Sequence, residues 1–312
     1  MNILLVIAGL VLLILGGNWL LKAAVSLSLK LEIPKIIIGM TVVSFATSAP
    51  ELIVSVRSAL SGFPDLALGN VVGSNIANLG LVLAITIILS AIHVERSFYT
   101  TNWPVMMIAS GLFYMFIAYD AVLERHEGTI LFVLLLVFLV YLLRFQKRAV
   151  SDDFSEDDVQ MPLYKTVAFL ILGGGVLWGG SELLITGAVG MAELFGVSER
   201  IIGVTVVSVG TSIPELAASV IAVLKKEKAI SLGNLIGSNV FNILAVLGIT
   251  AMITPIEARD HGLLNSDIYW MLLFAFIVLP LVFLPKGLRL GWRDGIVLLG
   301  LYVAFLYTTV LS

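Results

Sequence analysis

The sequence predicts an all-α integral membrane protein, with ten transmembrane helices arranged as two inverted-topology repeats of five. Two observations predict this fold: a composition that suits lipid as the solvent, and a long segment that occurs twice along the chain. Of the 312 residues, 59% are hydrophobic and only 12% are charged, and the mean hydropathy is +1.08. Roughly a quarter of the residues in a soluble domain are charged. A water-soluble domain is therefore excluded.

The predicted spans are apolar runs between charged residues. A helix needs about 20 apolar residues to cross the hydrocarbon layer of a bilayer. Ten runs meet this requirement, at residues 2–21, 36–60, 66–92, 99–119, 128–145, 166–190, 201–224, 229–256, 267–285 and 294–311. The longest polar connection contains the letters SDDFSEDD and separates five spans from five. We therefore expect a first five-helix repeat at residues 1–147, an acidic cytoplasmic linker at 148–162 and a second repeat at 163–312.

Lysine and arginine side chains gather in alternate connections. If the connections after odd-numbered spans are cytoplasmic, 14 of these side chains face the cytoplasm and 4 face the other side. Cytoplasmic loops of membrane proteins carry an excess of lysine and arginine. We therefore expect a multi-pass protein of the cell membrane with both termini external. The first 21 residues carry no charge, which predicts a retained first helix rather than a cleaved signal peptide.

An internal repeat relates the two halves of the chain. One constant shift aligns IIGMTVVSFATSAPELIVSV, from Ile37, with IIGVTVVSVGTSIPELAASV, from Ile201, and 14 of the 20 positions are identical. The same shift aligns LGNVVGSNIAN, from Leu68, with LGNLIGSNVFN, from Leu232. Five predicted spans separate the copies, so the second copy enters the membrane from the opposite side. Inverted repeats of this kind are common among secondary transporters.

Each copy carries one acid inside an otherwise uncharged span. Glu51 and Glu215 lie about 15 residues into the second and seventh spans. A carboxylate at this depth costs at least about 2.5 kcal/mol, so acids in the membrane are usually functional and face the protein interior. The alternative is a structural acid that pairs with a base. Because no lysine or arginine lies in the core of any predicted span, we expect a functional pair.

A proline precedes each acid. Pro50 and Pro214 have no amide hydrogen, and their rings clash with the carbonyls of Ala46 and Gly210 four residues earlier. Each helix should therefore break at this point. Backbone breaks at membrane depth are tolerated where the freed carbonyls line a cavity. Hydroxyl groups lie beside both breaks, at Thr47, Ser48, Thr211 and Ser212.

The third and eighth spans repeat a pattern of small and polar residues. Glycines at small-xxx-small spacing predict close helix packing, at Gly69, Gly73, Gly233 and Gly237. Ser74 with Asn78, and Ser238 with Asn242, are four residues apart, so each pair shares one helical face. Four other asparagines are expected to form interhelical hydrogen bonds: Asn70, Asn75, Asn234 and Asn239.

These residues together predict a site built from oxygen ligands. Calcium takes six to eight oxygens in flexible geometry, whereas transition metals favour imidazole or thiolate ligands. The chain has no cysteine, and its histidines, His93, His126 and His261, fall in predicted loops. Two carboxylates match the charge of one calcium ion, and they also suit sodium ions. A transporter that alternates between these two loads is an antiporter.

The repeated motifs GMTVVSFATSAPE with GNVVGSNIAN, and GVTVVSVGTSIPE with GNLIGSNVFN, closely resemble the two alpha repeats of the sodium/calcium exchanger family. This resemblance implies exchange of three sodium ions for one calcium ion by alternating access. It also implies that Glu51 and Glu215 are shared between calcium and sodium sites. The remaining ligands that it implies are the carbonyls of Ser44 and Ser208, the hydroxyls of Thr47, Ser48, Thr211, Ser212, Ser74 and Ser238, and the amides of Asn78 and Asn242.

The sequence departs from one version of this pattern at Asn242. In the family that this chain resembles, some prokaryotic members and the potassium-dependent branch carry aspartate at the position that matches Asn242. Potassium co-transport is therefore not expected. With two acids, three sodium ions leave a net charge of +1, which predicts electrogenic exchange. The cation/proton branch usually reads GNxxE where this chain reads GNVVGSN and GNLIGSN.

Because this chain lacks the glutamate of the GNxxE pattern, calcium/proton exchange is the alternative function and not the first expectation. A calcium channel is less favoured because the duplication suits alternating access. The expected partners are calcium and sodium ions and the lipid bilayer. We expect no enzymatic activity, no cofactor and no nucleic-acid partner. The protein is expected to function as a monomer.

Overall fold

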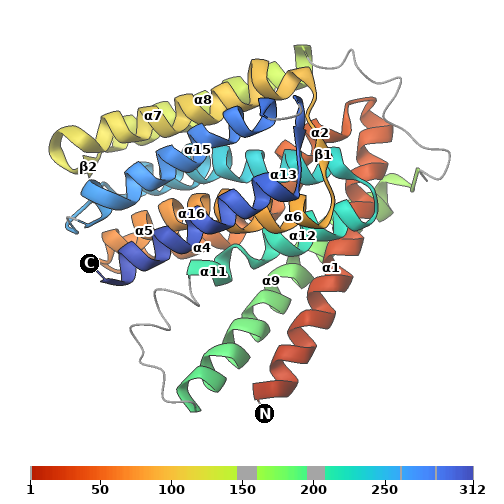
Figure 1. Ribbon diagram of the computed structural model, residues 1–312, viewed down its shortest axis with the longest axis horizontal. Coiled ribbons are helices and arrows are strands. Elements are labelled where there is room, and N and C mark those ends of the chain that lie inside the picture. The colour runs from red at the N-terminus through yellow and green to blue at the C-terminus, as the bar shows by residue number, and fades with distance from the viewer. Residues whose placement is uncertain (1, 146–159, 195–207, 261, 285–286, 312) are drawn as a thin grey trace. The chain divides into compact units, whose positions relative to one another are not determined.

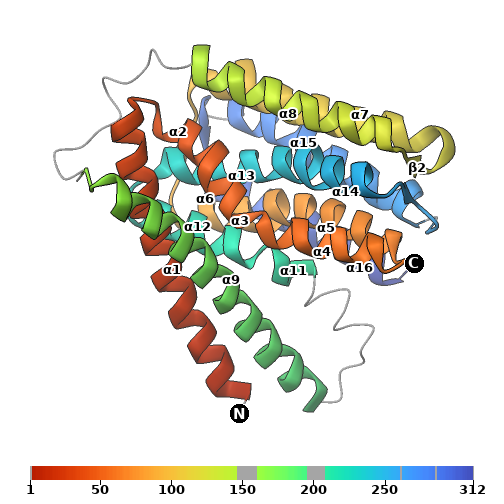
Figure 2. The same cartoon turned by 180° about the vertical axis from the view of Figure 1, so that it is seen from behind.

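The computed structural model describes residues 2–145, 160–194, 208–260, 262–284 and 287–311. The predicted helical class is confirmed, since the described residues form long helices and only four two-residue strands (Figures 1 and 2). The predictions for residues 148–159 of the acidic linker and for residues 201–207 of the seventh span lie outside the described residues.

The helices of the first half are α1 (Asn2–Leu31), α2 (Lys35–Ile38), α3 (Ser44–Thr47), α4 (Ala49–Leu60), α5 (Pro64–Ala77), α6 (Ala84–Leu89), α7 (Trp103–Asp120) and α8 (Arg125–Phe145). Those of the second half are α9 (Leu163–Leu194), α11 (Ser208–Thr211), α12 (Ile213–Leu224), α13 (Lys228–Phe241), α14 (Gly248–Ile253), α15 (Ile268–Phe283) and α16 (Trp292–Leu311). Wider π-helical turns interrupt several of them, at η1 (Gly39–Val43), η2 (Asn78–Leu83), η3 (Phe98–Asn102), η5 (Asn242–Leu247) and η6 (Leu263–Asp267).

The described helices have the length and apolar character expected of a membrane protein. Seven of them are long and apolar enough to cross a bilayer, and the bent pair Lys35–Thr47 and Ala49–Leu60 makes up to eight. The first helix is longer than predicted, since α1 continues to Leu31 instead of ending at residue 21. The apolar run stops at Lys22, but Ala23, Ala24 and Ser26 are buried, so packing extends the helix beyond the apolar run.

The secondary structure repeats at the same offset as the sequence. The bounds of α4, α5, η2 and α6 recur at α12, α13, η5 and α14 with the shift that aligns Ile37 with Ile201. The short strand β1 (Ile92–His93) recurs at β3 (Ile256–Glu257). The two copies of the repeat therefore fold into the same succession of helices and helix interruptions.

The described chain forms two compact units. The first unit comprises residues 1–47 and 141–234, and the second unit comprises residues 48–140 and 235–312. Each unit takes residues from both halves of the sequence, so the packing within a unit joins segments that are far apart along the chain.

In the first unit, α1 and α9 lie side by side along most of their length (Figures 1 and 2). Glycines permit this close approach: a Cβ atom added at Gly9 would lie 2.7 Å from the carbonyl oxygen of Gly180. A Cβ atom at Gly16 would lie 2.7 Å from the backbone nitrogen of Leu177. Small residues of this kind allow helix backbones to approach in a membrane.

The segment around α2 packs as closely against α13 in the same unit. A Cβ atom at Gly39 would lie 2.5 Å from the Ile230 carbonyl oxygen and 3.1 Å from the Cα of Gly233. At the start of α2, the buried Lys35 ammonium lies 3.0 Å from the Glu227 carboxylate. Backbone packing and a partly buried ion pair therefore fix the segment that leads into the first helix break.

In the second unit, α4 packs against α5, and α7 packs against α15. Two short antiparallel ladders join its connections: β1 pairs with β4 (Arg289–Leu290), and β2 (Val122–Leu123) pairs with β3. The Asp65 carboxylate accepts a hydrogen bond of 2.7 Å from the backbone amide of Arg259. These contacts fix the ends of the helices that carry the candidate site residues.

Candidate ion-binding site

Both predicted helix breaks are present. The chain leaves the helix at Ser48, between α3 and α4, and the two flanking helical segments are bent by 44°. It leaves the helix again at Ser212, between α11 and α12, with almost the same backbone angles. Pro50 and Pro214 lie in the first turn of α4 and α12, where their missing amide hydrogen costs least.

The two acids occupy equivalent places after the breaks. Glu51 is the third residue of α4 and Glu215 is the third residue of α12, and both side chains are 0% exposed. The prediction that both face the protein interior is thus confirmed. The first turn of a helix carries partial positive charge, which favours a carboxylate over a neutral acid. Each repeat therefore presents one buried, anion-favouring position.

In the second unit, the predicted serine and asparagine pairs, with the serines in α5 and α13 and the asparagines directly after these helices, are fully buried. Ser74, Asn78, Ser238 and Asn242 are each 0% exposed. Asn78 and Asn242 are the first residues of η2 and η5, and π-helical turns of this kind occur frequently at functional sites. Because α4 contacts both α5 and η5, this unit gathers one acid with hydroxyl and amide groups.

Several buried polar atoms remain without a hydrogen bond. Among the described residues, neither polar atom of the Asn78 amide has a partner, and the same holds for the Asn242 Oδ1 and the Ser212 hydroxyl. A buried polar group without a hydrogen bond costs about 1–3 kcal/mol. Buried oxygens without a hydrogen bond can coordinate a cation that has lost its water shell.

In the first unit, the hydroxyls beside the first break make specific contacts. Ser44 donates to the Asn234 carbonyl at 3.0 Å, and Thr47 lies 3.2 Å from the Asn234 Oδ1. Both residues are 0% exposed, Ser48 is 3% exposed and Ser212 is 1% exposed. Thr211 is half-buried at the end of α11. Ser208 begins α11, and its side chain lies outside the described part of the structure.

The prediction of interhelical asparagine hydrogen bonds is confirmed for three residues. Asn70 and Asn234 each donate to a serine hydroxyl of the preceding helix at 3.0 Å, Ser55 and Ser219 respectively. Asn75 donates to the backbone carbonyl of Asn239. For the Asn239 side chain the prediction is wrong, because its amide donates to the Leu235 carbonyl of its own helix.

Sequence reasoning missed Ser55 and Ser219. The available signal was the constant shift between the two repeats, since it pairs Ser55 with Ser219 and so places them at equivalent positions.

The predicted packing role of the glycines is confirmed at one of the four positions. Added Cβ atoms at Gly69 and Gly73 would meet no atom within 4 Å among the described residues. The repeat shift places the counterparts of Ile36 and Gly39 at residues 200 and 203, which lie outside the described part of the chain, so the packing role of Gly69 and Gly73 stays a prediction. A Cβ atom at Gly233 would overlap the Ile36 carbonyl, which confirms that position. The role of Gly237 stays a prediction.

A serine of α9 supports the second break. Pro214 cannot donate to the Gly210 carbonyl as a residue of a continuous helix would. The Ser181 hydroxyl donates to this carbonyl at 3.0 Å, and Ser181 is 4% exposed. The equivalent position of the first repeat is Gly17, which has no hydroxyl. Ser181 therefore supplies a donor at one break only, and no local pattern in the sequence indicated this contact.

Replacing Ser181 with alanine is expected to lower the free energy of unfolding by about 1–3 kcal/mol, because the buried Gly210 carbonyl loses its donor. The thermal unfolding of the purified protein in detergent measures this effect. Ser181→Thr retains the hydroxyl and is expected to unfold close to the wild type. An alanine variant that unfolds at the wild-type temperature would contradict the assignment.

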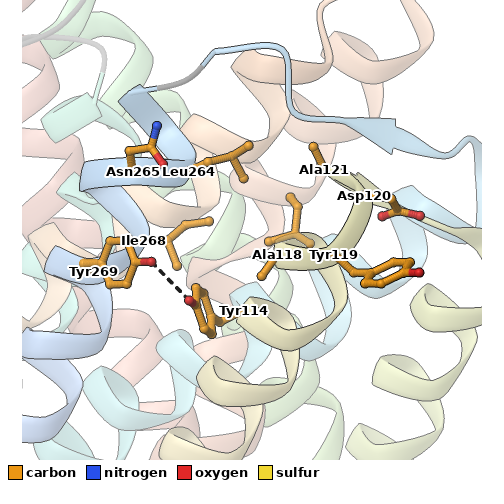
Figure 3. Close-up of a pocket in the computed structure, with 10 residues that line it drawn as sticks. Tyr114, Ala118, Tyr119, Asp120, Ala121, Leu264, Asn265, Ile268 and Tyr269 are labelled. Carbon is orange, nitrogen blue, oxygen red and sulfur yellow. Dashed lines mark hydrogen bonds between the residues drawn. The ribbon is translucent and has the colours of Figure 1, made fainter.

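A separate cavity of about 370 Å³ lies in the second unit, between the end of α7 and the start of α15 (Figure 3). Tyr114 and Tyr269 line it and share a hydrogen bond of 3.1 Å between their hydroxyls. Asp120 and Asn265 also line it. None of the predicted ion ligands lies on its wall, so this cavity is distinct from the candidate site.

Apolar helices, two equivalent breaks and buried acids define a membrane ion transporter. The family model described as sodium/calcium exchanger protein matches residues 1–144 and 165–311. The chain therefore belongs to the sodium/calcium exchanger family, as its motifs predicted. At this level it is an antiporter of the cation/calcium class.

Known proteins resemble almost the whole chain. It is 39% identical to the putative antiporter CaxA of Alkalimonas amylolytica over 312 residues, with 97% of this chain and 96% of the relative covered. It is 35% identical to the inner membrane protein YrbG of Escherichia coli over 310 residues, covering 97% and 94%. It is 29% identical to the sodium/calcium exchanger MaX1 of Methanosarcina acetivorans over 347 residues, covering 98% and 97%.

A solved structure of the sodium-calcium exchanger NCX_Mj, soaked without sodium and calcium, superposes with a TM-score of 0.83 at 26% identity and covers 99% of this chain and 98% of that one. The structure of NCX_Mj soaked with 2.5 mM Na⁺ and 0.1 mM Ca²⁺ gives a TM-score of 0.80 at 26% identity, covering 97% and 96%. The similarity thus extends over almost the full length of both chains.

Proposed function

We propose that the protein exchanges three sodium ions for one calcium ion across the cell membrane, by alternating access and without potassium. The observation that carries this proposal is the pair of fully buried acids, Glu51 and Glu215, each in the first turn of a helix that follows a break. Two negative charges balance one calcium ion. Three sodium ions exceed them by one charge, so each cycle moves one net charge.

The remaining ligands of the proposed site are oxygens near the two breaks. Calcium requires several oxygens beyond two carboxylates, and the Asn78 and Asn242 oxygens, which have no hydrogen bond among the described residues, support such a role. The proposed sodium ligands are the carbonyls of Ser44 and Ser208 with the hydroxyls of Thr47, Ser48, Thr211, Ser212, Ser74 and Ser238. Asn78 and Asn242 complete the calcium site.

The proposed architecture is a bundle of ten membrane-spanning helices in two inverted repeats, at residues 1–147 and 163–312 with the linker 148–162 between them. The recurrence of helix bounds at one constant offset supports the duplication. The uneven distribution of lysine and arginine, 14 against 4, supports opposite insertion of the repeats and external termini. We propose that one monomer contains the complete transport site.

Calcium uptake by proteoliposomes tests the proposed function. Vesicles that contain the purified protein are loaded with sodium, diluted into sodium-free buffer without potassium, and supplied with radioactive calcium. A tenfold outward sodium gradient supplies about 4 kcal/mol for three ions, enough to hold a roughly thousandfold calcium gradient. An inside-positive potential is expected to accelerate uptake, because one net positive charge leaves the vesicle in each cycle.

The same vesicles distinguish the alternative functions. An outward proton gradient without sodium is expected to drive no calcium accumulation, and accumulation under this condition would favour calcium/proton exchange. Rapid calcium entry without any counter-ion gradient would instead indicate a channel. A calcium gradient that rises with the square of the sodium gradient, and not with its cube, would contradict the proposed stoichiometry.

A further inference from the structure

Asn78 and Asn242 are equivalent residues of the repeat, but their amides have different surroundings in the second unit. The Asn242 Nδ2 donates to the Oδ1 of Asn75 at 3.1 Å, while the Asn242 Oδ1 has no partner among the described residues. For Asn78, neither amide atom has a partner in that part of the chain. All three side chains are buried, with exposures of 0 to 1%.

The orientation of the Asn75 amide follows from its other contacts. Its Nδ2 lies 3.4 Å from the backbone carbonyl of Asn239 and 3.8 Å from the sulfur of Met271. A carbonyl and a thioether can only accept hydrogen bonds. The amide nitrogen of Asn75 must therefore point toward them, which leaves its oxygen to face Asn242.

The orientation of Asn242 follows in turn. A side-chain oxygen on Asn75 accepts hydrogen bonds, so Asn242 must present its NH₂ group to it. The Asn242 oxygen then points away from Asn75. A cation is attracted to the oxygen of an amide and repelled by its NH₂ group, so this orientation determines whether Asn242 can serve as a ligand.

We propose that Asn75 is a positioning residue, which holds the Asn242 amide with its oxygen available to calcium. This inference rests on the proposed function, because it concerns the same ion site. It also explains why a neutral amide can serve at position 242. A carboxylate presents oxygen in both orientations, whereas an amide needs a neighbour that selects one of them.

Among the described residues, Asn78 has no arrangement equivalent to the Asn75–Asn242 hydrogen bond. Asn239 corresponds to Asn75, but its amide donates to the Leu235 carbonyl of its own helix at 2.8 Å. The Asn78 amide is therefore not oriented by an equivalent hydrogen bond. Asn242 is a pre-oriented ligand, and Asn78 is an adaptable one.

Equilibrium binding of radioactive calcium to the purified full-length protein in detergent tests this assignment. Asn75→Leu removes the acceptor and keeps a similar side-chain volume. We expect it to weaken calcium binding roughly 10–100-fold, the usual effect of losing a residue that orients a metal ligand. The matched control is Asn239→Leu, which retains the backbone carbonyl that Asn75 contacts and is expected to bind calcium as the wild type does.

A double-mutant cycle with Asn242→Ala separates positioning from a general structural effect. If Asn75 acts through Asn242, then Asn75→Leu produces no further loss of affinity in the Asn242→Ala protein. The same loss in both backgrounds would overturn the inference, and so would equal affinities of Asn75→Leu and Asn239→Leu.

If Asn75→Leu yields no folded protein, Asn75→Ala replaces it in the cycle with the same expected results. A wild type that binds no calcium would overturn the proposed function itself, whereas calcium binding that is insensitive to Asn75 overturns this inference alone.

Discussion

Replacing either Glu51 or Glu215 with glutamine is expected to abolish calcium transport. Glutamine keeps the shape of the side chain and one oxygen but removes a full negative charge. Both side chains are 0% exposed, so the charge acts at close range on a bound ion. Opposite charges about 4 Å apart interact with about 4 kcal/mol at an effective dielectric constant of 20, so we expect a loss of at least about 100-fold. Sodium-driven calcium uptake by proteoliposomes measures it.

The matched control for these variants is Glu182→Gln. Glu182 is also an acid within a long apolar helix, α9, but its side chain is exposed. Its replacement removes the same charge from the membrane region and is expected to leave uptake close to the wild-type rate. Calcium transport that persists in Glu51→Gln or Glu215→Gln would show that the two buried acids are not both required.

Replacing Gly39 with valine is expected to prevent normal folding of the first unit. The added Cβ atom would lie 2.5 Å from the Ile230 carbonyl oxygen and 3.1 Å from the Cα of Gly233. Both neighbours are backbone atoms, which cannot move aside by a rotamer change. Overpacking usually costs about 1–3 kcal/mol and occasionally more, and we expect the upper end of this range or beyond. Size-exclusion chromatography and thermal unfolding of the detergent-solubilised protein measure the effect.

Gly111→Val provides the control for Gly39→Val. Gly111 lies within α7, and a Cβ atom there would meet no described atom within 4 Å. This variant introduces the same side chain into a membrane helix without a backbone clash. It is expected to elute and unfold much as the wild type does. If both variants behave alike, the close approach of Gly39 and Gly233 is not essential for folding.

The sequence predicted those features that depend on local chemistry. Apolar runs located the helices because lipid requires about 20 apolar residues for each crossing. Pro50 and Pro214 located the breaks because proline lacks an amide hydrogen. The burial of Glu51 and Glu215 followed from the cost of exposing a carboxylate to lipid.

The features that the sequence did not reveal depend on neighbours in space. The hydroxyl of Ser181 lies 3.0 Å from the Gly210 carbonyl, but 29 residues separate the two along the chain. The order of apolar residues also does not indicate the π-helical turns that begin at Asn78 and Asn242. These turns change the path of the backbone and leave the apolar pattern unchanged.

The repeat itself shows a further limit of sequence comparison. Asn75 and Asn239 occupy equivalent positions within nearly identical motifs, but one bonds across helices and the other bonds within its own helix. Equivalent residues of a duplicated chain have different neighbours, so their roles diverge even where the letters agree.

The most direct test is anomalous diffraction from crystals soaked in strontium, a divalent ion that stands in for calcium. The predicted result is one strong peak within oxygen-ligand distance of both the Glu51 and the Glu215 carboxylates, which disappears in excess sodium. A peak that lies elsewhere while both acids contact lipid or a basic side chain would contradict the account.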